Sequence, residues 1–153
     1  MLSASERERY QRQVIIEGFG ESAQRKLGAA RALVAGAGGL GSAIALYLSA
    51  AGIGALRFVD HGAVDLSNLN RQVLYTSDDI GRRKVDCLVP RLARLNPAVR
   101  IETSGRTIDG GSVLDLMHGF LDASRRGRHQ RISSSCGRPE PLPTGLAEGR
   151  LDE

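Results

Sequence analysis

The chain has 153 residues, of which 41% are hydrophobic and 25% charged, a composition typical of one ordinary globular domain. It contains no run of about 18 apolar residues, and its charged start, MLSASERERY, is unlike a signal peptide, so neither a membrane span nor export is indicated and a cytoplasmic protein is expected. The net charge of +4 includes four arginines within 125–131, and the aromatic content of 4% is too low for base-stacking surfaces, which argues against nucleic-acid binding.

Residues 1–30 are predicted to form an amphipathic helical arm that precedes the main domain. Its basic residues are expected on polar faces: Arg7, Arg9, Arg12, Arg25 and Lys26. Its apolar residues are expected to anchor the arm: Val14, Ile15, Ile16 and Phe19.

Residues 31–120 are predicted to form a Rossmann-like α/β domain. Short apolar or alternating runs predict strands at 30–37, 55–60 and 99–103. Between the first two lies a helix of about 13 residues that ends at Gly52, and a short helix is expected at 110–120. Strands that alternate with helices at this spacing indicate βαβ units and a parallel sheet.

A further helix is predicted from about Asp79. Its apolar residues recur at helical spacing and form one stripe: Val85, Leu88, Val89, Leu92 and Leu95. Pro90 lies inside this stripe, and a proline in a helix interior costs roughly 3 kcal/mol relative to alanine. We therefore expect either a kink near Asp86 to Pro90 or a helix rescued by its packing.

The strongest local motif is GAGGLG at 36–41, where the first strand turns into the first helix of the domain. Gly36, Gly38 and Gly41 match G-x-G-x-x-G, and Gly39 lies within the same turn. Such a turn lets a phosphate approach the backbone at a helix N-terminus. Asp60 ends the second strand, where a carboxylate can accept hydrogen bonds from ribose hydroxyls. These residues predict a nucleotide site, although glycine-rich turns also occur for packing alone.

The loop SNLNRQ at 67–72 favours a polyphosphate over a dinucleotide. Asn68, Asn70, Arg71 and Gln72 bring amides and a guanidinium to the mouth of the same crevice, and Lys84 adds a second cation. Together these groups could hold the β- and γ-phosphates of ATP and stabilise the charge that develops as pyrophosphate leaves. A solvated polar loop followed by a surface lysine remains the alternative.

Five segments in order resemble the ThiF/MoeB/HesA family, the bacterial relatives of ubiquitin-activating enzymes. They are RYQRQVIIEGFG at 9–20, VAGAGGLGS at 34–42, FVDHGAVDLSNLNRQ at 58–72, GRRKVD at 81–86 and LNP at 95–97. The resemblance covers roughly residues 7–120.

The resemblance implies an ATP-dependent adenylyltransferase. In this family the C-terminal Gly-Gly carboxylate of a small ubiquitin-like sulfur-carrier protein attacks the α-phosphate of ATP, which gives an acyl-adenylate and pyrophosphate. By position, the glycines of 36–41 correspond to the phosphate-facing turn and Asp60 to the ribose ligand. Asn68, Arg71 and Lys84 correspond to phosphate contacts. Arg12 corresponds to an arginine that reaches into the ATP site of a partner subunit, so the resemblance also implies a homodimer.

The chain also departs from the family pattern. Many members carry an acidic residue at the place of Gly62. Members also continue into a fourth strand whose aspartate holds Mg²⁺, and later carry CxxC pairs for zinc. Neither feature is found here: the two cysteines, Cys87 and Cys136, form no CxxC pair, so they are interpreted as free thiols, zinc is not expected and no metal ligand is assigned.

Residues 121–153 have a composition dominated by arginine, serine, glycine and proline and are expected to be a disordered tail. The Rossmann-like domain is therefore expected to be incomplete, truncated after about three strands. One codon choice for residues 125–131, read one base later, gives Val-Val-Asp-Ala-Thr-Asn, so a frameshifted gene is one explanation. A short family member is another.

Three functions remain open from the sequence. The first is an adenylyltransferase of this family that is impaired by the missing Mg²⁺ aspartate. The second is a non-catalytic partner subunit that lends Arg12 to a full-length paralogue. The third is an NAD-dependent oxidoreductase, whose cofactor binding would not depend on Arg71 or Lys84.

Overall fold

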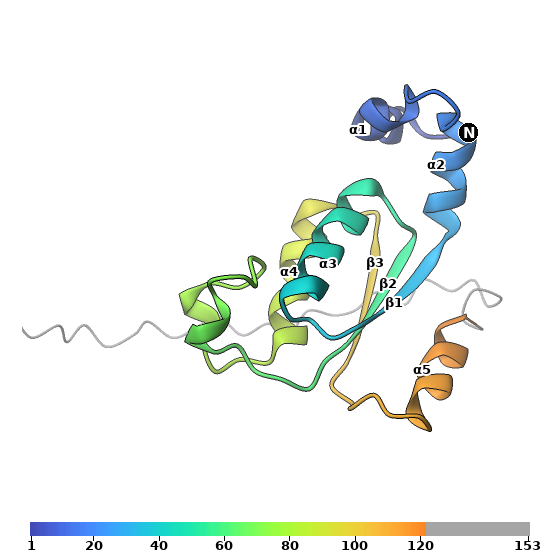
Figure 1. The fold of residues 1–153 in the computed structure, drawn as a ribbon. Coiled ribbons are helices and arrows are strands. Elements are labelled where there is room, and N and C mark those ends of the chain that lie inside the picture. Colours follow the sequence, from blue (N-terminus) through green and yellow to red (C-terminus); the bar gives the residue numbers. More distant parts are fainter. Residues whose placement is uncertain (122–153) are drawn as a thin grey trace, which may run out of the picture.

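The structure is a computed structural model that describes residues 1–121, so the expectations for the tail lie outside the described residues. The elements in chain order are α1 (Ala4–Val14), α2 (Gly20–Ala29), β1 (Arg31–Ala35), α3 (Gly39–Ala51), β2 (Ala55–Val59), the 3₁₀ turns η1 (Leu66–Asn68) and η2 (Ser77–Asp79), α4 (Lys84–Leu95), β3 (Arg100–Ser104) and α5 (Ser112–Leu121) (Figure 1).

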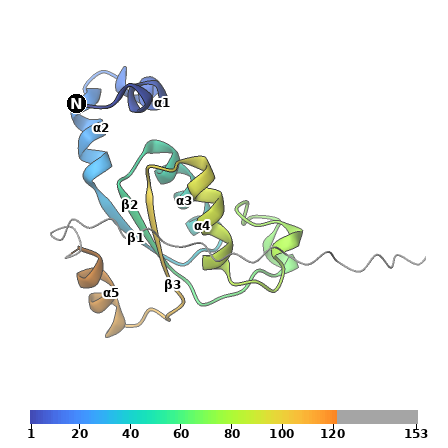
Figure 2. The same ribbon diagram turned by 180° about the vertical axis from the view of Figure 1, so that it is seen from behind.

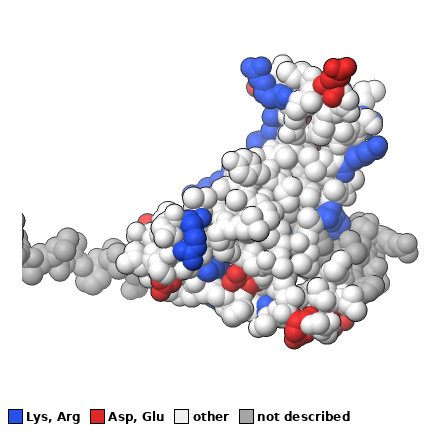
Figure 3. All heavy atoms as spheres, viewed as in Figure 1, with Lys and Arg blue, Asp and Glu red and all other residues white. Residues whose placement is uncertain are grey.

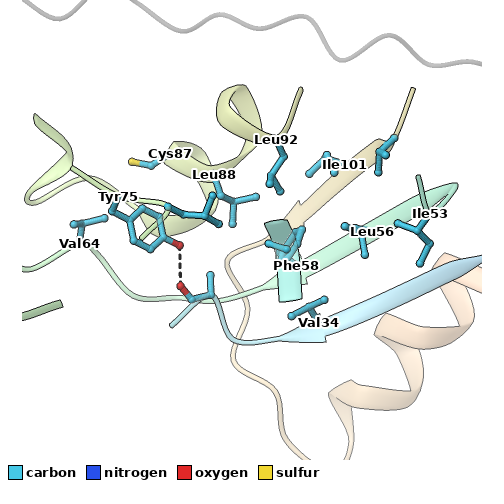
Figure 4. Packing of buried hydrophobic residues seen from close by; sticks show 14 residues of the cluster. Val34, Ile53, Leu56, Phe58, Val64, Tyr75, Cys87, Leu88, Leu92 and Ile101 are labelled. Atoms are coloured by element: carbon cyan, nitrogen blue, oxygen red, sulfur yellow. Dashed lines mark hydrogen bonds between the residues drawn. The ribbon is translucent and has the colours of Figure 1, made fainter. Parts of the chain in front are cut away.

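The three strands form one parallel sheet in the order β1-β2-β3, with Val34 of β1 opposite Phe58 and Phe58 opposite Thr103 of β3. α3 and α4 cover one face of this sheet, and α5 lies on the other (Figures 1 and 2). Side chains of β2 and α4 meet in the core, where Phe58, Leu88 and Leu92 are completely buried (Figure 4). The predicted Rossmann-like α/β fold is confirmed.

The face of the sheet toward α5 carries an ion-pair cluster beside the buried apolar residues Ala55 and Val59 of β2. Three arginines from the three strands surround Glu102 of β3: Arg31 at 3.6 Å, Arg100 at 2.8 Å, and Arg57, which also donates hydrogen bonds to it. Arg57 donates a further hydrogen bond of 2.7 Å to the carbonyl oxygen of Leu116 in α5. Parallel sheets normally have apolar side chains on both faces, so a cluster of charged side chains on one face is unusual.

The arm formed by α1 and α2 is anchored at the amino ends of the strands. Tyr10 of α1 is buried, and its hydroxyl accepts a hydrogen bond of 2.9 Å from Asn96, which follows α4. Gln13 and Gln24 donate hydrogen bonds of 2.8 and 3.0 Å to the carbonyl oxygen of Ala51, the last residue of α3. The arm is therefore attached where α3 and α4 end.

The predicted apolar anchor of the arm is wrong in its main members. Ile15 is 67% exposed and Ile16 is 57% exposed. The reason is that α1 ends at Val14, so both isoleucines lie in the turn between α1 and α2, outside the helical stripe. Sequence periodicity gave no sign of this boundary.

The start of α4 was also predicted too early. Ser77–Asp79 form a separate 3₁₀ turn, Gly81 has a φ of +82°, and α4 begins only at Lys84. Once begun, the helix runs through Pro90 to Leu95 without a break. Leu88 and Leu92 on either side of the proline are completely buried, which agrees with the alternative of a helix rescued by packing.

Asp79 fastens the loop before α4 to that helix. Its carboxylate accepts hydrogen bonds from the backbone of Thr76 at 2.8 Å and from Arg91 of α4 at 2.6 Å, and Arg82 lies 3.4 Å away. Burial alone would raise the pKa of Asp79, but the hydrogen bonds from Thr76 and Arg91 outweigh it and lower the pKa below its usual value.

Among the described residues, no helix is both long enough and apolar enough to cross a membrane.

We expect Asp79→Asn to lower the free energy of unfolding at pH 7 by about 2 kcal/mol, because charge-assisted hydrogen bonds contribute about 1.5–3 kcal/mol each. The folded pKa lies below the unfolded one, so the carboxylate stabilises the fold fully above about pH 4 and ceases to do so as the pH falls further. Urea unfolding at pH 7 and pH 3 measures the difference, which should shrink at pH 3. Asp78→Asn, at the exposed neighbour, is the control and should have little effect at either pH.

Candidate functional site

The turn between β1 and α3 brings two backbone segments into very close approach. A Cβ atom on Gly41 would lie 2.0 Å from the carbonyl oxygen of Gly36, and Gly36 itself has a φ of +89°. Gly36 donates a hydrogen bond of 2.9 Å to Val59 at the end of β2, which places the turn at the carboxyl edge of the sheet. Gly38 caps α3 without a side-chain hydrogen bond. The first N–H groups of α3 are therefore available to an anion.

Both backbone groups of Ala37, at the centre of this turn, are held by other elements. Its N–H donates a hydrogen bond of 2.7 Å to one carboxylate oxygen of Asp60, whose other oxygen accepts a hydrogen bond of 2.7 Å from the N–H of Gly62. The hydroxyl of Tyr75 donates a hydrogen bond of 2.8 Å to the carbonyl oxygen of Ala37 (Figure 4). Burial raises the pKa of Tyr75, so the hydroxyl remains a donor at neutral pH. Sequence reasoning missed Tyr75.

The polar loop at 67–72 lies against the start of α3. The backbone N–H groups of Arg71 and Gln72 donate to the carbonyl oxygen of Asn68, at 3.2 and 2.9 Å, which closes the loop. The side chain of Asn68 accepts a hydrogen bond of 3.3 Å from the backbone of Asp65 as part of a capping box. Asn68 is thus held by the loop that it belongs to.

The aliphatic part of the Arg71 side chain packs along the glycine turn, and its guanidinium group points back to its own loop. Its Cγ lies 3.5 Å from the position that a Cβ on Gly39 would take. Its Nη1 donates hydrogen bonds to the carbonyl oxygen of Ser67 at 3.0 Å and to the side chain of Asn70 at 2.9 Å. A phosphate at the turn would have to draw the guanidinium away from these two acceptors.

Gln72 lies beneath the turn and is only 4% exposed. Its Nε2 is 3.9 Å from the position of a Cβ on Gly38, and its Oε1 has no hydrogen-bond partner among the described residues. A buried acceptor without a partner costs about 1–3 kcal/mol, so the Oε1 of Gln72 is suited to accept a hydrogen bond from a donor group of a ligand.

Lys84 brings an ammonium group to the same edge. As the first residue of α4, it donates a backbone hydrogen bond of 3.0 Å to Gly62. Its Nζ lies 3.7 Å, and Oδ1 of Asp60 3.1 Å, from the position that a Cβ on Gly62 would take. A side chain at position 62 would therefore crowd the carboxylate of Asp60, and glycine avoids this contact.

The structure therefore gathers most of the predicted residues at the carboxyl edge of the sheet: Gly36, Gly38, Gly39, Gly41, Asp60, Asn68, Arg71 and Lys84. Arg12 is not among them. It is exposed on α1, at the other end of α3. The 13 residues of α3 separate the two ends by about 20 Å.

The described residues do not form a metal site. Residues 1–121 contain no group of three or more histidine, cysteine, aspartate or glutamate side chains that could hold a metal ion. Cys87 is buried, which raises its pKa to about 11, so it is a thiol at neutral pH and unsuited to act as a nucleophile.

Comparison with known proteins gives one matching family and several relatives. The profile of the ThiF family matches residues 10–121. The vegetative HesA protein of Trichormus variabilis is 46% identical over 153 residues, an alignment that covers 97% of this chain and 58% of that protein. The sulfur carrier protein adenylyltransferase of Thermus thermophilus is 40% identical over 122 residues, which cover 78% of this chain and 45% of that protein.

A solved structure agrees with this relationship. The E. coli tRNA N6-threonylcarbamoyladenosine dehydratase in complex with AMP superposes with a TM-score of 0.72 at 28% identity, over 78% of this chain and 48% of that one. The same enzyme was also solved in complex with ATP. The present chain thus spans about half the length of the relatives that it matches.

We expect Gly41→Ala to lower the free energy of unfolding by about 3 kcal/mol, the upper end of what overpacking costs, because the new methyl group would meet the backbone of Gly36. Gly39→Ala is the control, since its methyl group would meet only the flexible stem of Arg71 at an ordinary distance. Thermal and urea unfolding of both variants measure the difference. Equal effects would show that the close approach at Gly36 is not what requires glycine.

Proposed function

The chain belongs to the ThiF family, and on that premise we propose that residues 31–121 are the ATP-binding part of an adenylyltransferase. The observation that carries this proposal is the glycine turn, whose close approach to Gly36 leaves the N-terminus of α3 uncapped beside Asp60, Arg71 and Lys84. The dehydratase complexes with ATP and AMP, whose proteins share this part of the fold, support the same ligand class.

The site suits a nucleotide at three points. Phosphates would lie at the N-terminus of α3, where unpaired N–H groups and the helix dipole favour negative charge. Each carboxylate oxygen of Asp60 accepts one N–H bond and keeps a second lone pair, which is available to a ribose hydroxyl. The Oε1 of Gln72, which has no partner among the described residues, could accept a hydrogen bond from a hydroxyl or amino group of the nucleotide.

Arg71 and Lys84 would supply the positive charge for the phosphate chain, and Asn68 a side-chain amide donor. Lys84 has its ammonium at the edge already, beside Asp60. Arg71 is bound to Ser67 and Asn70, and we expect it to exchange these neutral acceptors for phosphate oxygens, which form stronger, charge-assisted bonds.

The reaction proposed for the whole protein is adenylation of a small carrier protein that ends in Gly-Gly. A terminal carboxylate oxygen would form a bond to the α-phosphorus of ATP, and the bond from that phosphorus to the oxygen bridging to the β-phosphate would break. Pyrophosphate would leave with the electron pair, and Lys84 and Arg71 would stabilise its developing charge. The name of the Thermus thermophilus relative, sulfur carrier protein adenylyltransferase, supports this substrate class.

The described residues do not fit the Mg²⁺ that the family resemblance implies. Within 1–121 there is no group of three or more acidic, histidine or cysteine side chains that could hold it. No step is therefore assigned to a metal held by these residues.

Arg12 would act on the site of a second copy. Because it lies beyond the far end of α3, a helix about 20 Å long, we expect it to reach a nucleotide on another copy that presents its carboxyl edge to the arm. This geometry supports the homodimer, and equally a subunit that lends Arg12 to a paralogue.

We expect Lys84→Ala to weaken ATP binding about tenfold and adenosine binding hardly at all, because only the phosphate chain contacts the ammonium. Isothermal titration of both ligands measures this, with Arg94→Ala, an exposed cation at the other end of α4, as the control. Binding of NAD that is indifferent to Lys84→Ala, together with no affinity for ATP, would favour the oxidoreductase instead.

Mixing of Arg12→Ala and Lys84→Ala chains tests the trans arrangement. Each variant alone should lack ATP–pyrophosphate exchange with a Gly-Gly-ending carrier protein present, whereas random heterodimers contain one intact site and should restore about a quarter of the wild-type exchange. No recovery in a mixture whose unmixed wild type is active would contradict a role for Arg12 in trans. If the chain acts only as a partner subunit, the wild type itself would show no exchange until a paralogue is added.

A further inference from the structure

The start of α4 brings two consecutive cations to the ends of two different strands. Lys84 lies at the end of β2, where its Nζ is 3.7 Å from the position that a Cβ on Gly62 would take. Arg83, the N-cap residue of α4, points instead to Gly105, which follows β3. Figure 3 shows basic and acidic side chains close together in the lower middle of the view, over the part of this edge where α4 begins in Figure 1. The proposed ATP site uses Lys84 and gives Arg83 no role.

Glycine at position 105 admits the guanidinium of Arg83 to the end of β3. A Cβ on Gly105 would lie 2.8 Å from Nη2 and 3.4 Å from Cζ of Arg83, and the first distance is shorter than van der Waals contact allows. The φ angle of Gly105 is outside the left-handed region, so its backbone conformation does not require glycine. The contact with Arg83 is the constraint on position 105 that the described residues show.

The remaining interaction of Arg83 is a weak one. Its Nε lies 3.5 Å from a carboxylate oxygen of Asp86, and the two side chains are 60% and 56% exposed. Ion pairs between side chains that are this exposed contribute little to stability. The fold therefore gains little from Arg83, and a ligand can engage its guanidinium without breaking a strong contact.

The strand order determines where each part of a bound nucleotide would lie. The glycine turn follows β1 and Asp60 follows β2, and the N–H of Asp60 donates a hydrogen bond of 3.0 Å to the carbonyl oxygen of Ser104 at the end of β3. The three strand ends thus lie side by side in the order β1-β2-β3, about 4.8 Å apart. Phosphates and base leave a ribose from opposite sides. With the phosphates at the turn and the ribose at Asp60, the base extends over the end of β3.

We propose that Arg83 binds the base of the nucleotide, with its guanidinium stacked on the base beside Gly105. The inference rests on the ATP site proposed above and adds the residue that contacts the base. A guanidinium is planar and cationic, so it is attracted to the face of an aromatic ring and stacks on nucleic-acid bases. Lys84 and Arg83 then contact different parts of the ligand, the phosphate chain and the base.

The first test is isothermal titration of the full chain with four ligands: ATP, AMP, adenosine and inorganic tripolyphosphate, which has no base. Arg83→Ala should weaken binding of the three adenine compounds by a similar factor, about five- to tenfold, and leave tripolyphosphate within about twofold. Lys84→Ala should show the opposite order, with a loss for ATP and tripolyphosphate and hardly any for adenosine. Arg94→Ala, an exposed cation at the other end of α4, controls for the loss of a positive charge.

A second variant moves the guanidinium without removing its charge. Gly105→Ala should weaken adenosine binding about as much as Arg83→Ala does, because the methyl group would take the space of Nη2. The two losses should not add in the double variant, since the displaced group is then already absent. Gly110→Ala, at a glycine whose Cβ would meet nothing within 4 Å, is the matched control. Additive losses would show that position 105 acts on the base without Arg83 and would overturn the contact.

Each other result of the first test has a distinct meaning. Unchanged binding of ATP and adenosine by Arg83→Ala overturns the inference and leaves the proposed function intact. A loss that tripolyphosphate shares overturns it as well, because Arg83 would then act on the phosphates. If the wild-type chain binds none of the four ligands, the proposed function itself is contradicted, and the inference with it.

Discussion

The close approach of Gly41 to Gly36 is the constraint on which the carboxyl edge of this chain depends. It lets α3 begin directly above the end of β1, so the helix N-terminus faces solvent at the point where the turn passes. The turn is then fixed from two sides through Ala37, by Asp60 from β2 and by Tyr75 from beyond the polar loop. A single short turn thus joins three segments that are distant in sequence.

Several features of the site do not favour the stability of the fold but suit the binding of a ligand. Gln72 is buried with an unpaired acceptor, α3 begins without a side-chain cap, and Arg71 is occupied by neutral acceptors in its own loop. An anion would accept hydrogen bonds from the N–H groups at the start of α3 and offer Arg71 charged acceptors, whereas the Oε1 of Gln72 needs a donor such as a nucleotide hydroxyl or amino group. Asp79 and its hydrogen bonds lie outside this region and hold the loop to α4.

The sequence was informative where glycine, alternation or motif spacing determines structure, and uninformative where a single contact does. The three strands, the helix that ends at Gly52 and the position of Asp60 followed from local patterns, because burial and turn geometry leave few alternatives there. The start of α4 was missed because a 3₁₀ turn and a left-handed glycine interrupt a run that has helical composition. Tyr75 was missed because one hydrogen bond between positions 38 residues apart leaves no periodic signal. Arg12 was named only through resemblance, and nothing local to it indicates a partner.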